Sequence, residues 1–566
     1  MKIALLIGAQ FKLNQELLPL TSMQINLRYS LTLFLLAINA SSSSLAFKEP
    51  ATADRPNHYS SLEDPALNPW LSPLNQCAIQ PGQYHIDMDM GFLNTDYSCR
   101  IDPRLGAQFD TKTIQSTNRD AARLILSKIN SCQQLTAERV LVGASRNTAK
   151  QIQELIPTSP PESVVKIGKR NEGWNPPETH AKVFQLDNGL DQFFTVHGSL
   201  NLQTVGLTCK ANNALRFTEA NPVLYNYFQK LGDAVLVNDG KAGFGNDGEI
   251  NSSGTNLVPA RIGNYSVQFY GGRGMGFVGS VSALQNKSWP DYINPSIKNQ
   301  HAPGVVNWYD NIIYDAAKQL RQGRSVKIDV LIFEIGEENA FVNNLWCFVQ
   351  TGFSDGKSED KTSNENVPSP FIGKLNVRFL WQFQSGHNKN TKTYDILNGP
   401  SKITSPQANY TIETARIWPI LDSSGITVNP GTPRDMHNKL AILDVPGHEE
   451  ERRIYVTSSN MDTPNLGSGK LWQAGTIIEA RKGAHPWSGS NTDKPSLWKA
   501  YQQYFELLWS NREGHPNAGQ IYFSKLIDEK RSNGFVNWIE TMPQNSDVNQ
   551  NPKEGIDAFF FPIPID

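Results

Sequence analysis

The chain has 566 residues, and 39% of them are hydrophobic, so it carries enough apolar side chains for two packed cores or one large core. This composition excludes a chain that is disordered throughout. Lysine and arginine number 52 against 54 aspartates and glutamates, which leaves a formal net charge of −2. The nearly balanced charge lacks the basic excess expected of a protein that binds nucleic acid, but it does not exclude a local basic groove.

The N-terminus has the pattern of an export signal. From Met23 the chain has a basic start with Arg28, then an apolar run from Leu31 to Ala40 that is too short to span a bilayer, then small residues ending at Ala46. We predict that residues 1–46 are a signal segment and that the mature protein is exported, either to a periplasm or to the medium. A buried N-terminal helix is the alternative interpretation.

All of the cysteines follow this predicted signal segment, and none of them form a Cys-x-x-Cys pair, so zinc or thioredoxin-like chemistry has no support. Export would permit one or two disulfides among the first four, with the pairing left open. No later apolar run approaches the length of a membrane span. The five positions are Cys77, Cys99, Cys132, Cys209 and Cys347.

Two stretches of the chain show the same order of predicted elements, after a polar, proline-rich lead at 49–73. The first has helices at 118–129 and 148–156 and strands at 139–142, 164–167, 180–186 and 193–197. The second has helices at 308–321 and 338–348 and strands at 266–270, 326–333, 375–383, 439–443 and 454–457. Alternating helices and strands favour an α/β fold, and we predict an internal duplication: two similar units with mixed sheets flanked by helices.

The predicted units occupy residues 47–250 and 251–566. Within the second unit, the polar segment 355–370 and the long irregular segment 385–429 are interpreted as loop insertions. A late helix at 496–510 carries an apolar stripe whose spacing is typical of core packing. The stripe consists of Trp498, Tyr501, Phe505, Leu508 and Trp509.

The most specific motif in the sequence is an eight-residue phrase that occurs twice. Residues 180–187 and 437–444 both read His-x-Lys-x-x-x-x-Asp, and each copy is followed by a small polar phrase, at 198–201 and 457–460. At ordinary residue frequencies, two such copies are improbable by chance. The repeated phrase therefore marks corresponding positions in the two predicted units.

The spacing has a physical meaning on a strand, where side chains two residues apart point to the same face. His180 and Lys182 then project together, as do Ser199 and Asn201 on the next strand. Histidine can serve as nucleophile or proton donor near neutral pH, lysine offsets negative charge, and serine and asparagine donate hydrogen bonds. This set suits a phosphoryl group. The second copy supplies the same groups from His437, Lys439, Ser458 and Asn460.

Taken together, these phrases resemble the phospholipase D superfamily, in which two His-x-Lys-x4-Asp phrases are each followed by Gly-Ser-x-Asn. The resemblance implies two units related by a pseudo-two-fold axis, one shared active site, and phosphodiester exchange through a phosphohistidine without a metal or another cofactor. His180 would be the nucleophile and His437 the acid and base. The implied catalytic residues are His180, Lys182, Asp187, His437, Lys439 and Asp444, and the implied phosphate-binding residues are Ser199, Asn201, Ser458 and Asn460.

Several positions depart from the family pattern. Asp187 and Asp444 stand at an odd offset from their lysines, so we expect an orienting or structural role for them. Thr457 replaces the glycine of the second small polar phrase. The acidic residue that often follows the asparagine is replaced by Gln473 in the second unit, and Glu219 is the nearest candidate in the first.

We expect an exported phosphodiesterase that hydrolyses phospholipid head groups and makes peripheral contact with a membrane. A secreted nuclease using the same residues is the nearest alternative, and it would need a basic groove with stacking aromatic side chains. A third hypothesis is a catalytically weakened binding or effector module that keeps the fold. The sequence leaves open the head group, the acceptor and the oligomeric state.

Overall fold

The structure is a computed structural model in which the chain divides into Met1–Asn57 and His58–Asp566. The predicted signal segment 1–46 lies outside the described residues, and every element below belongs to His58–Asp566. The described residues are 68–79, 83–93, 121–131, 135–145, 149–155, 164–169, 179–203, 206, 210–237, 243–245, 258–273, 305–336, 339, 341–342, 345, 373–384, 392–400, 402–404, 410–417, 435–461, 471–487, 496–510, 512–516, 545–546 and 554–561.

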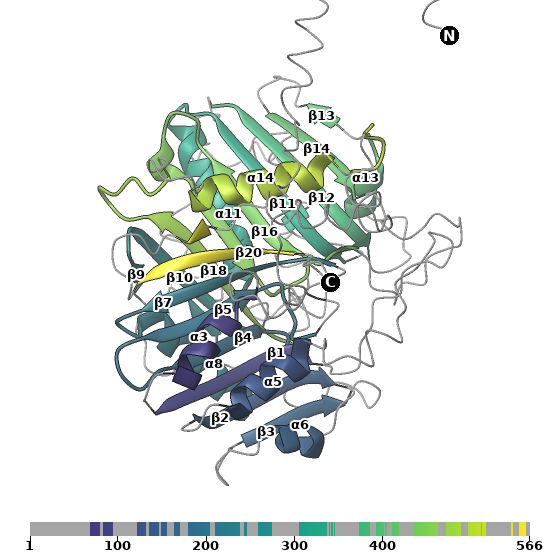
Figure 1. Cartoon of the computed structure of the whole chain (residues 1–566). Coiled ribbons are helices and arrows are strands. Elements are labelled where there is room, and N and C mark those ends of the chain that lie inside the picture. The colour runs from purple at the N-terminus through teal and green to yellow at the C-terminus, as the bar shows by residue number, and fades with distance from the viewer. Residues whose placement is uncertain are drawn as a thin grey trace, which may run out of the picture. The chain divides into compact units, whose positions relative to one another are not determined.

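The first sheet has eight strands in the order β19-β20-β7-β5-β4-β1-β2-β3 (Figure 1). Strands β1, β2 and β3 run parallel, whereas β4, β5, β7 and β20 add to β1 in antiparallel succession. The strands are β1 (Tyr84–Leu93), β2 (Leu135–Ser145), β3 (Val164–Lys169), β4 (Lys182–Asp187), β5 (Phe193–Gly198), β7 (Asn213–Glu219), β19 (Asn545–Ser546) and β20 (Gly555–Phe560).

The second sheet has ten strands, nine of them in the order β13-β14-β12-β11-β16-β17-β18-β10-β8, with β9 paired to β10. It too is mixed, with β11, β12 and β14 parallel and β16, β17, β18 and β10 antiparallel in turn. The strands are β8 (Gly243–Gly245), β9 (Ala260–Ile262), β10 (Tyr265–Arg273), β11 (Val326–Ile335), β12 (Leu375–Gln384), β13 (Lys402–Thr404), β14 (Tyr410–Arg416), β16 (Lys439–Asp444), β17 (Arg453–Thr457) and β18 (Trp472–Ala480).

The two sheets repeat one pattern. The order β3-β2-β1-β4-β5-β7 in the first matches β14-β12-β11-β16-β17-β18 in the second, and corresponding neighbours run in the same relative directions. Strands β4 and β16, which carry the duplicated phrase, occupy equivalent central places. The predicted α/β class with two similar mixed sheets is therefore confirmed.

Each sheet is followed in the chain by a helix and then by a strand that joins the other sheet. After β7 the chain forms α8 (Val223–Val237) and then β8, β9 and β10, and β10 pairs with β18 in the second sheet. After β18 it forms α14 (Leu497–Ser510) and then β20, which pairs with β7 in the first. Because β20 completes the first sheet, the sheets do not divide cleanly at residue 250, where the predicted unit boundary falls.

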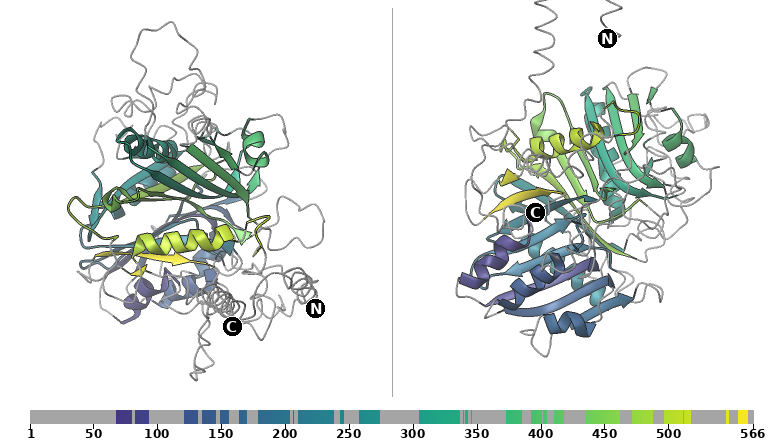
Figure 2. Two further views of the ribbon diagram at one scale, coloured as in Figure 1. Left: turned by 90° about the horizontal axis from the view of Figure 1, so that it is seen from above. Right: turned by 45° about the vertical axis from the view of Figure 1, so that its right-hand side comes forward.

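Helices lie against the sheet faces, as two further views show (Figure 2). Trp308 and Tyr309 of α11 (Val305–Arg321) donate hydrogen bonds to backbone carbonyls of β18 and of the segment after β17. The predicted apolar stripe of α14 is buried, so its assignment to the core is confirmed. No helix among the described residues has the length and hydropathy needed to cross a membrane. The remaining helices are α3 (Leu71–Ile79), α5 (Ala121–Ser131), α6 (Ala149–Leu155) and α13 (Lys392–Asn398).

The interpretation of segment 385–429 as an irregular loop is wrong. It contains α13, β13 and β14, and β14 pairs in parallel with β12. Along β14, buried residues alternate with polar, partly exposed ones, which concealed the strand among threonines and charged residues. The predicted helix 338–348 and loop 355–370 lie largely or wholly outside the described residues.

Cys77 forms a disulfide, and the expectation of one or two disulfides among the first four cysteines stays a prediction. The other four cysteines lie outside the described residues, so its partner is not among the residues that the structure describes.

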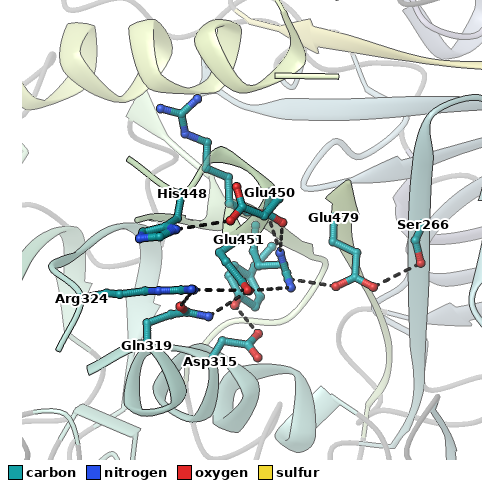
Figure 3. Close-up of polar contacts among 11 residues, drawn as sticks. Ser266, Asp315, Gln319, Arg324, His448, Glu450, Glu451 and Glu479 are labelled. Atoms are coloured by element: carbon teal, nitrogen blue, oxygen red, sulfur yellow. Dashed lines mark hydrogen bonds and ion pairs between the residues drawn. The ribbon is translucent and has the colours of Figure 1, made fainter. Parts of the chain in front are cut away.

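A polar network ties the turn between β16 and β17 to α11 (Figure 3). Within this turn, the 3-10 helix η4 (Glu449–Glu451) supplies Glu451, which accepts a hydrogen bond from Gln319 at 2.8 Å and lies 3.4 Å from Arg324. Arg453 of β17 pairs with Glu479 of β18 at 2.9 Å. These contacts fix the end of the hairpin that lies farthest from His437, since β16 begins at Lys439 and the turn follows its last residue.

An arginine ion pair is duplicated with the fold. In the second half, Arg378 of β12 binds Asp329 of β11 through two hydrogen bonds of 2.6 and 2.7 Å and reaches Glu506 of α14 at 2.7 Å. The first half repeats the set, with Arg139 of β2 pairing with Asp87 of β1 and Asp233 of α8. Each arginine thereby fastens a helix to two parallel strands.

We expect Arg378→Leu to lower the free energy of unfolding by about 3 kcal/mol, because Asp329 would stay buried without its partner. Glu506→Gln should cost much less, since that carboxylate is half exposed. Urea denaturation of both variants measures the difference. Equal losses would show that the buried pair is not the main source of the stabilisation.

Candidate active site

The two segments that carry the predicted histidines are held in the same way, each by the opposite half of the chain. The backbone N–H of His437 donates to the carbonyl of Ala211 at 2.7 Å, and that of His180 donates to the carbonyl of Trp472 at 2.8 Å. Parallel bridges accompany both contacts: β15 (Asp435–Met436) pairs with β6 (Lys210–Ala211), and Thr179 pairs with Trp472. Both histidines are thus brought to the junction of the two sheets.

Behind His437 lies an amide from the first half. The ring Nδ1 is 3.0 Å from Oδ1 of Asn212 and 2.9 Å from the carbonyl oxygen of Ser199. The Ser199 hydroxyl is 3.1 Å from the same Asn212 oxygen and accepts the backbone N–H of Asn213. The imidazole, the amide and the hydroxyl therefore form one buried network.

Behind His180 lies the equivalent amide from the second half. The ring Nδ1 is 3.2 Å from Oε1 and 3.1 Å from Nε2 of Gln473. The Ser458 hydroxyl donates to Gln473 Oε1 at 2.8 Å and accepts the backbone N–H of Ala474. Ser199 and Ser458, which the resemblance assigns to phosphate binding, thus lie behind the rings and orient the amides.

The two lysines of the duplicated phrase are buried and equivalent. Lys182 Nζ donates to the carbonyl of His180 at 2.7 Å, and Lys439 Nζ donates to that of His437 at 3.0 Å. Lys182 also reaches the Ser458 carbonyl of the opposite half at 3.5 Å. Each ammonium group is thereby fixed beside its own histidine, as the two-residue spacing predicted.

Asn201 and Asn460 are buried at the same junction but differ in their contacts. Asn460 donates from Nδ2 to Glu334 of β11 at 2.9 Å. Its Oδ1, like that of Asn201, has no hydrogen-bond partner among the described residues. Both asparagines stay predicted phosphate ligands, because Nδ2 of Asn460 has a second N–H beyond the one that it donates to Glu334.

Asp187 and Asp444 do not join the histidines. They end strands β4 and β16, whose first residues are the lysines, so each carboxylate lies a full strand length away. Asp187 accepts the backbone N–H of Gly189, and Asp444 accepts a hydrogen bond from Arg452. Their assignment to the catalytic set is corrected, since these contacts give them the structural role that their odd offset indicated.

Glu219 is not the counterpart of Gln473. Its carboxylate accepts the backbone N–H groups of Leu224 and Tyr225, each at 2.8 Å, and so caps the start of α8. Burial raises the pKa of this carboxyl to about 7. Asn212 takes the place instead. It immediately precedes β7 as Gln473 lies at the start of β18, so recognising β7 in the sequence would have identified it.

Residues outside the duplicated phrases make the two sides of the site unequal. Phe333 of β11 packs on the His437 ring with centroids 4.9 Å apart, and Lys439 Nζ lies 5.1 Å from the same phenyl centroid. The equivalent residue on β1 is Gly91, where the methyl group of an alanine would come within 3.1 Å of the His180 ring. The His180 side is therefore bounded by backbone alone at this point.

Burial and the lysine charges together set the electrostatics of the site. Burial, followed by the charges of Lys439, Lys210, Lys182 and His180, holds the pKa of His437 well below its ordinary value of 6.5. Burial and Lys210 also lower the pKa of Lys182, while the buried carboxylate of Asp89 opposes that shift. A site of this kind favours binding of an anion, which would offset the crowded positive charge.

His197 lies outside the hydrogen bonds of the site, although the charge of Lys182 acts on its ring. It is fully buried on β5, and burial lowers the pKa of its ring to about 3. The unfolded chain binds a proton there near pH 6.5 and the folded chain does not, so stability falls as the pH drops below that value. Between pH 6.5 and 5 we expect this residue alone to cost about 2 kcal/mol.

His197→Leu should therefore remove that part of the acid sensitivity. Urea denaturation at the two pH values measures it, with a substitution of the exposed His485, His485→Asn, as the surface control. An unaltered slope in the leucine variant would show that His197 is not held neutral in the folded protein.

No family model matches the chain, and no curated protein is significantly similar to it in sequence. Among solved structures, polyphosphate kinase from Porphyromonas gingivalis aligns with 77% of this chain and 44% of its own, with 11% identity and a TM-score of 0.35. Yeast tyrosyl-DNA phosphodiesterase aligns with 74% of this chain and 87% of its own, with 11% identity and a TM-score of 0.33.

Helicobacter pylori NucT covers 36% of this chain and 91% of its own, with 9% identity and a TM-score of 0.17. The chain thus spans less than half of the polyphosphate kinase. Likeness at these values carries no argument about activity, so the functional conclusion has to come from the residues of the site.

Proposed function

We propose that this protein is a phosphodiesterase of the phospholipase D type that works through a covalent phosphohistidine. The single observation that carries the proposal is the duplicated site: two imidazoles, each held by an amide of the opposite half and each accompanied by a buried lysine. A substitution at phosphorus that proceeds in two displacements needs one group on each side of the phosphorus atom. Two related half-sites supply that arrangement.

The chemistry follows from what the groups can donate and accept. One imidazole attacks phosphorus, and the other protonates the leaving alcohol and then takes a proton from the incoming water. Lys182 and Lys439 offset the negative charge that the phosphoryl oxygens carry in the transition state. Because Nδ1 of each ring faces an amide, the reacting nitrogen is Nε2 in both cases.

For the substrate, we propose the phosphodiester of a phospholipid head group. The nearly balanced charge of the whole chain supports a lipid better than a polyanionic nucleic acid, whose binding draws on many basic contacts. Export through the segment 1–46 belongs to the same proposal, because an exported enzyme of this type would meet lipids from outside the cell.

The test uses the full chain with three substrates: phosphatidylcholine vesicles, single-stranded DNA and bis(4-nitrophenyl) phosphate, each with and without a chelator. We expect turnover of the lipid and of the chromogenic diester, unaffected by the chelator. His180→Asn and His437→Asn should each lower lipid turnover by a factor of about 10⁴, since each removes a reacting group. His485→Asn is the matched control, because that side chain is exposed and outside the site.

Turnover of DNA without lipid would replace the lipid proposal with the nuclease alternative. Loss of activity with the chelator would contradict the histidine mechanism. An absence of turnover for all three substrates would favour the binding module and end the phosphodiesterase proposal.

A further inference from the structure

The two histidines have equivalent backbone positions, but the groups around Nδ1 restrict its protonation differently in the two rings. At His437, both neighbours of Nδ1 are acceptors. A backbone carbonyl cannot donate, and Asn212 uses its Nδ2 to donate to the Gly206 carbonyl at 2.7 Å, which turns its Oδ1 toward the ring. Nδ1 of His437 therefore always carries a proton, and in the neutral ring the lone pair is on Nε2.

At His180 the partner is less restrictive. Both polar atoms of the Gln473 amide lie within hydrogen-bond distance of Nδ1, so the amide can accept a hydrogen bond from the ring through Oε1 or donate one to it through Nε2. His180 can consequently hold a proton on either nitrogen or on both. A nucleophile needs its lone pair fixed on Nε2, which the acceptors around His437 enforce and the Gln473 amide does not.

The two rings also differ in how closely they are packed. His437 is 6% exposed and is covered by Phe333. His180 is only partly buried, and Gly91, the counterpart of Phe333, contributes no side chain beside its ring. A leaving alcohol and an incoming water both have to reach the acid and base, whereas the nucleophile has to reach phosphorus alone. The more open ring therefore fits the acid and base.

We propose that His437 is the nucleophile and His180 the acid and base, with Asn212 the positioning residue that aims the His437 lone pair. This assignment reverses the roles that the family resemblance implied, and it rests on the proposed phosphodiesterase function. The cationic surroundings of His437, namely Lys439, Lys210, Lys182 and His180, agree with it because they favour a neutral ring.

The steps balance without another reactant. Nε2 of His437 forms a bond to phosphorus while the bond from phosphorus to the leaving oxygen breaks, and that oxygen takes the Nε2 proton of His180. Water then attacks phosphorus from the side opposite His437, which the leaving oxygen has vacated, its proton passes to Nε2 of His180, and the bond between phosphorus and His437 breaks. Both rings return to their starting protonation states.

The direct test uses bis(4-nitrophenyl) phosphate, whose nitrophenolate leaves without help from an acid. His180→Asn should release about one equivalent of nitrophenolate per protein in a burst and then stall, because no base activates water for the second step. Mass spectrometry after an alkaline quench should find the phosphoryl adduct on His437. His437→Asn should show neither burst nor adduct.

A burst in His437→Asn with an adduct on His180 would overturn the assignment and leave the phosphodiesterase function standing. If the wild type turns the diester over but neither variant shows a burst, the assignment also fails. If the wild type turns over no diester, the proposed function itself has failed.

A second measurement keeps both histidines in place. Asn212→Asp puts a carboxylate on His437 and Gln473→Glu puts one on His180, so each should raise the pKa of its own ring. The acid limb of the pH profile for kcat/KM reports the nucleophile, which has to be neutral, and the alkaline limb reports the acid, which has to be protonated.

Asn212→Asp should therefore move the acid limb upward by about one pH unit, and Gln473→Glu should move the alkaline limb upward by a similar amount. The charged groups that act on His437 are Lys439, Lys210, Lys182 and His180. Those that act on the neighbouring Lys182 are Asp89 and Lys210. Both variants keep all of these groups. The opposite pairing of limbs and variants would show that His180 is the nucleophile.

Discussion

The site depends on a reciprocal hold between the two halves of the chain. Each histidine is fixed twice by residues of the opposite half, once through its backbone N–H and once through the amide behind its ring. Neither half can therefore present its imidazole correctly alone. The exchange of β10 and β20 between the sheets supports this hold, because each half also completes the other's hydrogen-bonded ladder. The site is therefore complete only when both copies of the duplicated fold are present.

Burial makes this arrangement demanding. Lysines, amides and hydroxyls at the junction lie almost wholly out of contact with water, and a buried polar group costs free energy unless it is hydrogen-bonded. The serines and amides satisfy one another in matching networks, and each lysine ammonium group donates to the carbonyl of its own histidine. The positive charge favours binding of an anionic diester, and after burial it is the second cause that lowers the pKa of His437.

The sequence predicted the part of the site that recurs at fixed spacing. His180, Lys182 and their second copies could be found because a strand's alternation converts a two-residue spacing into a shared face. Asn212 could not be found, since it is one of several asparagines and its place depends on β7, a strand that the periodicity did not reveal. The same limit hid β1, which follows a polar lead, and β14, whose exposed face is polar. Gly91 and Phe333 correspond only through sheet register, which emerges from pairing over long separations in the chain.

The central claim is that two half-sites act on one phosphorus atom, and a crystal structure with orthovanadate tests it most directly. We predict a single five-coordinate vanadium bonded to Nε2 of His437, with an apical oxygen facing Nε2 of His180 and equatorial oxygens near Lys182 and Lys439. Vanadate bound away from both rings, or the two rings opening onto separate cavities, would contradict it.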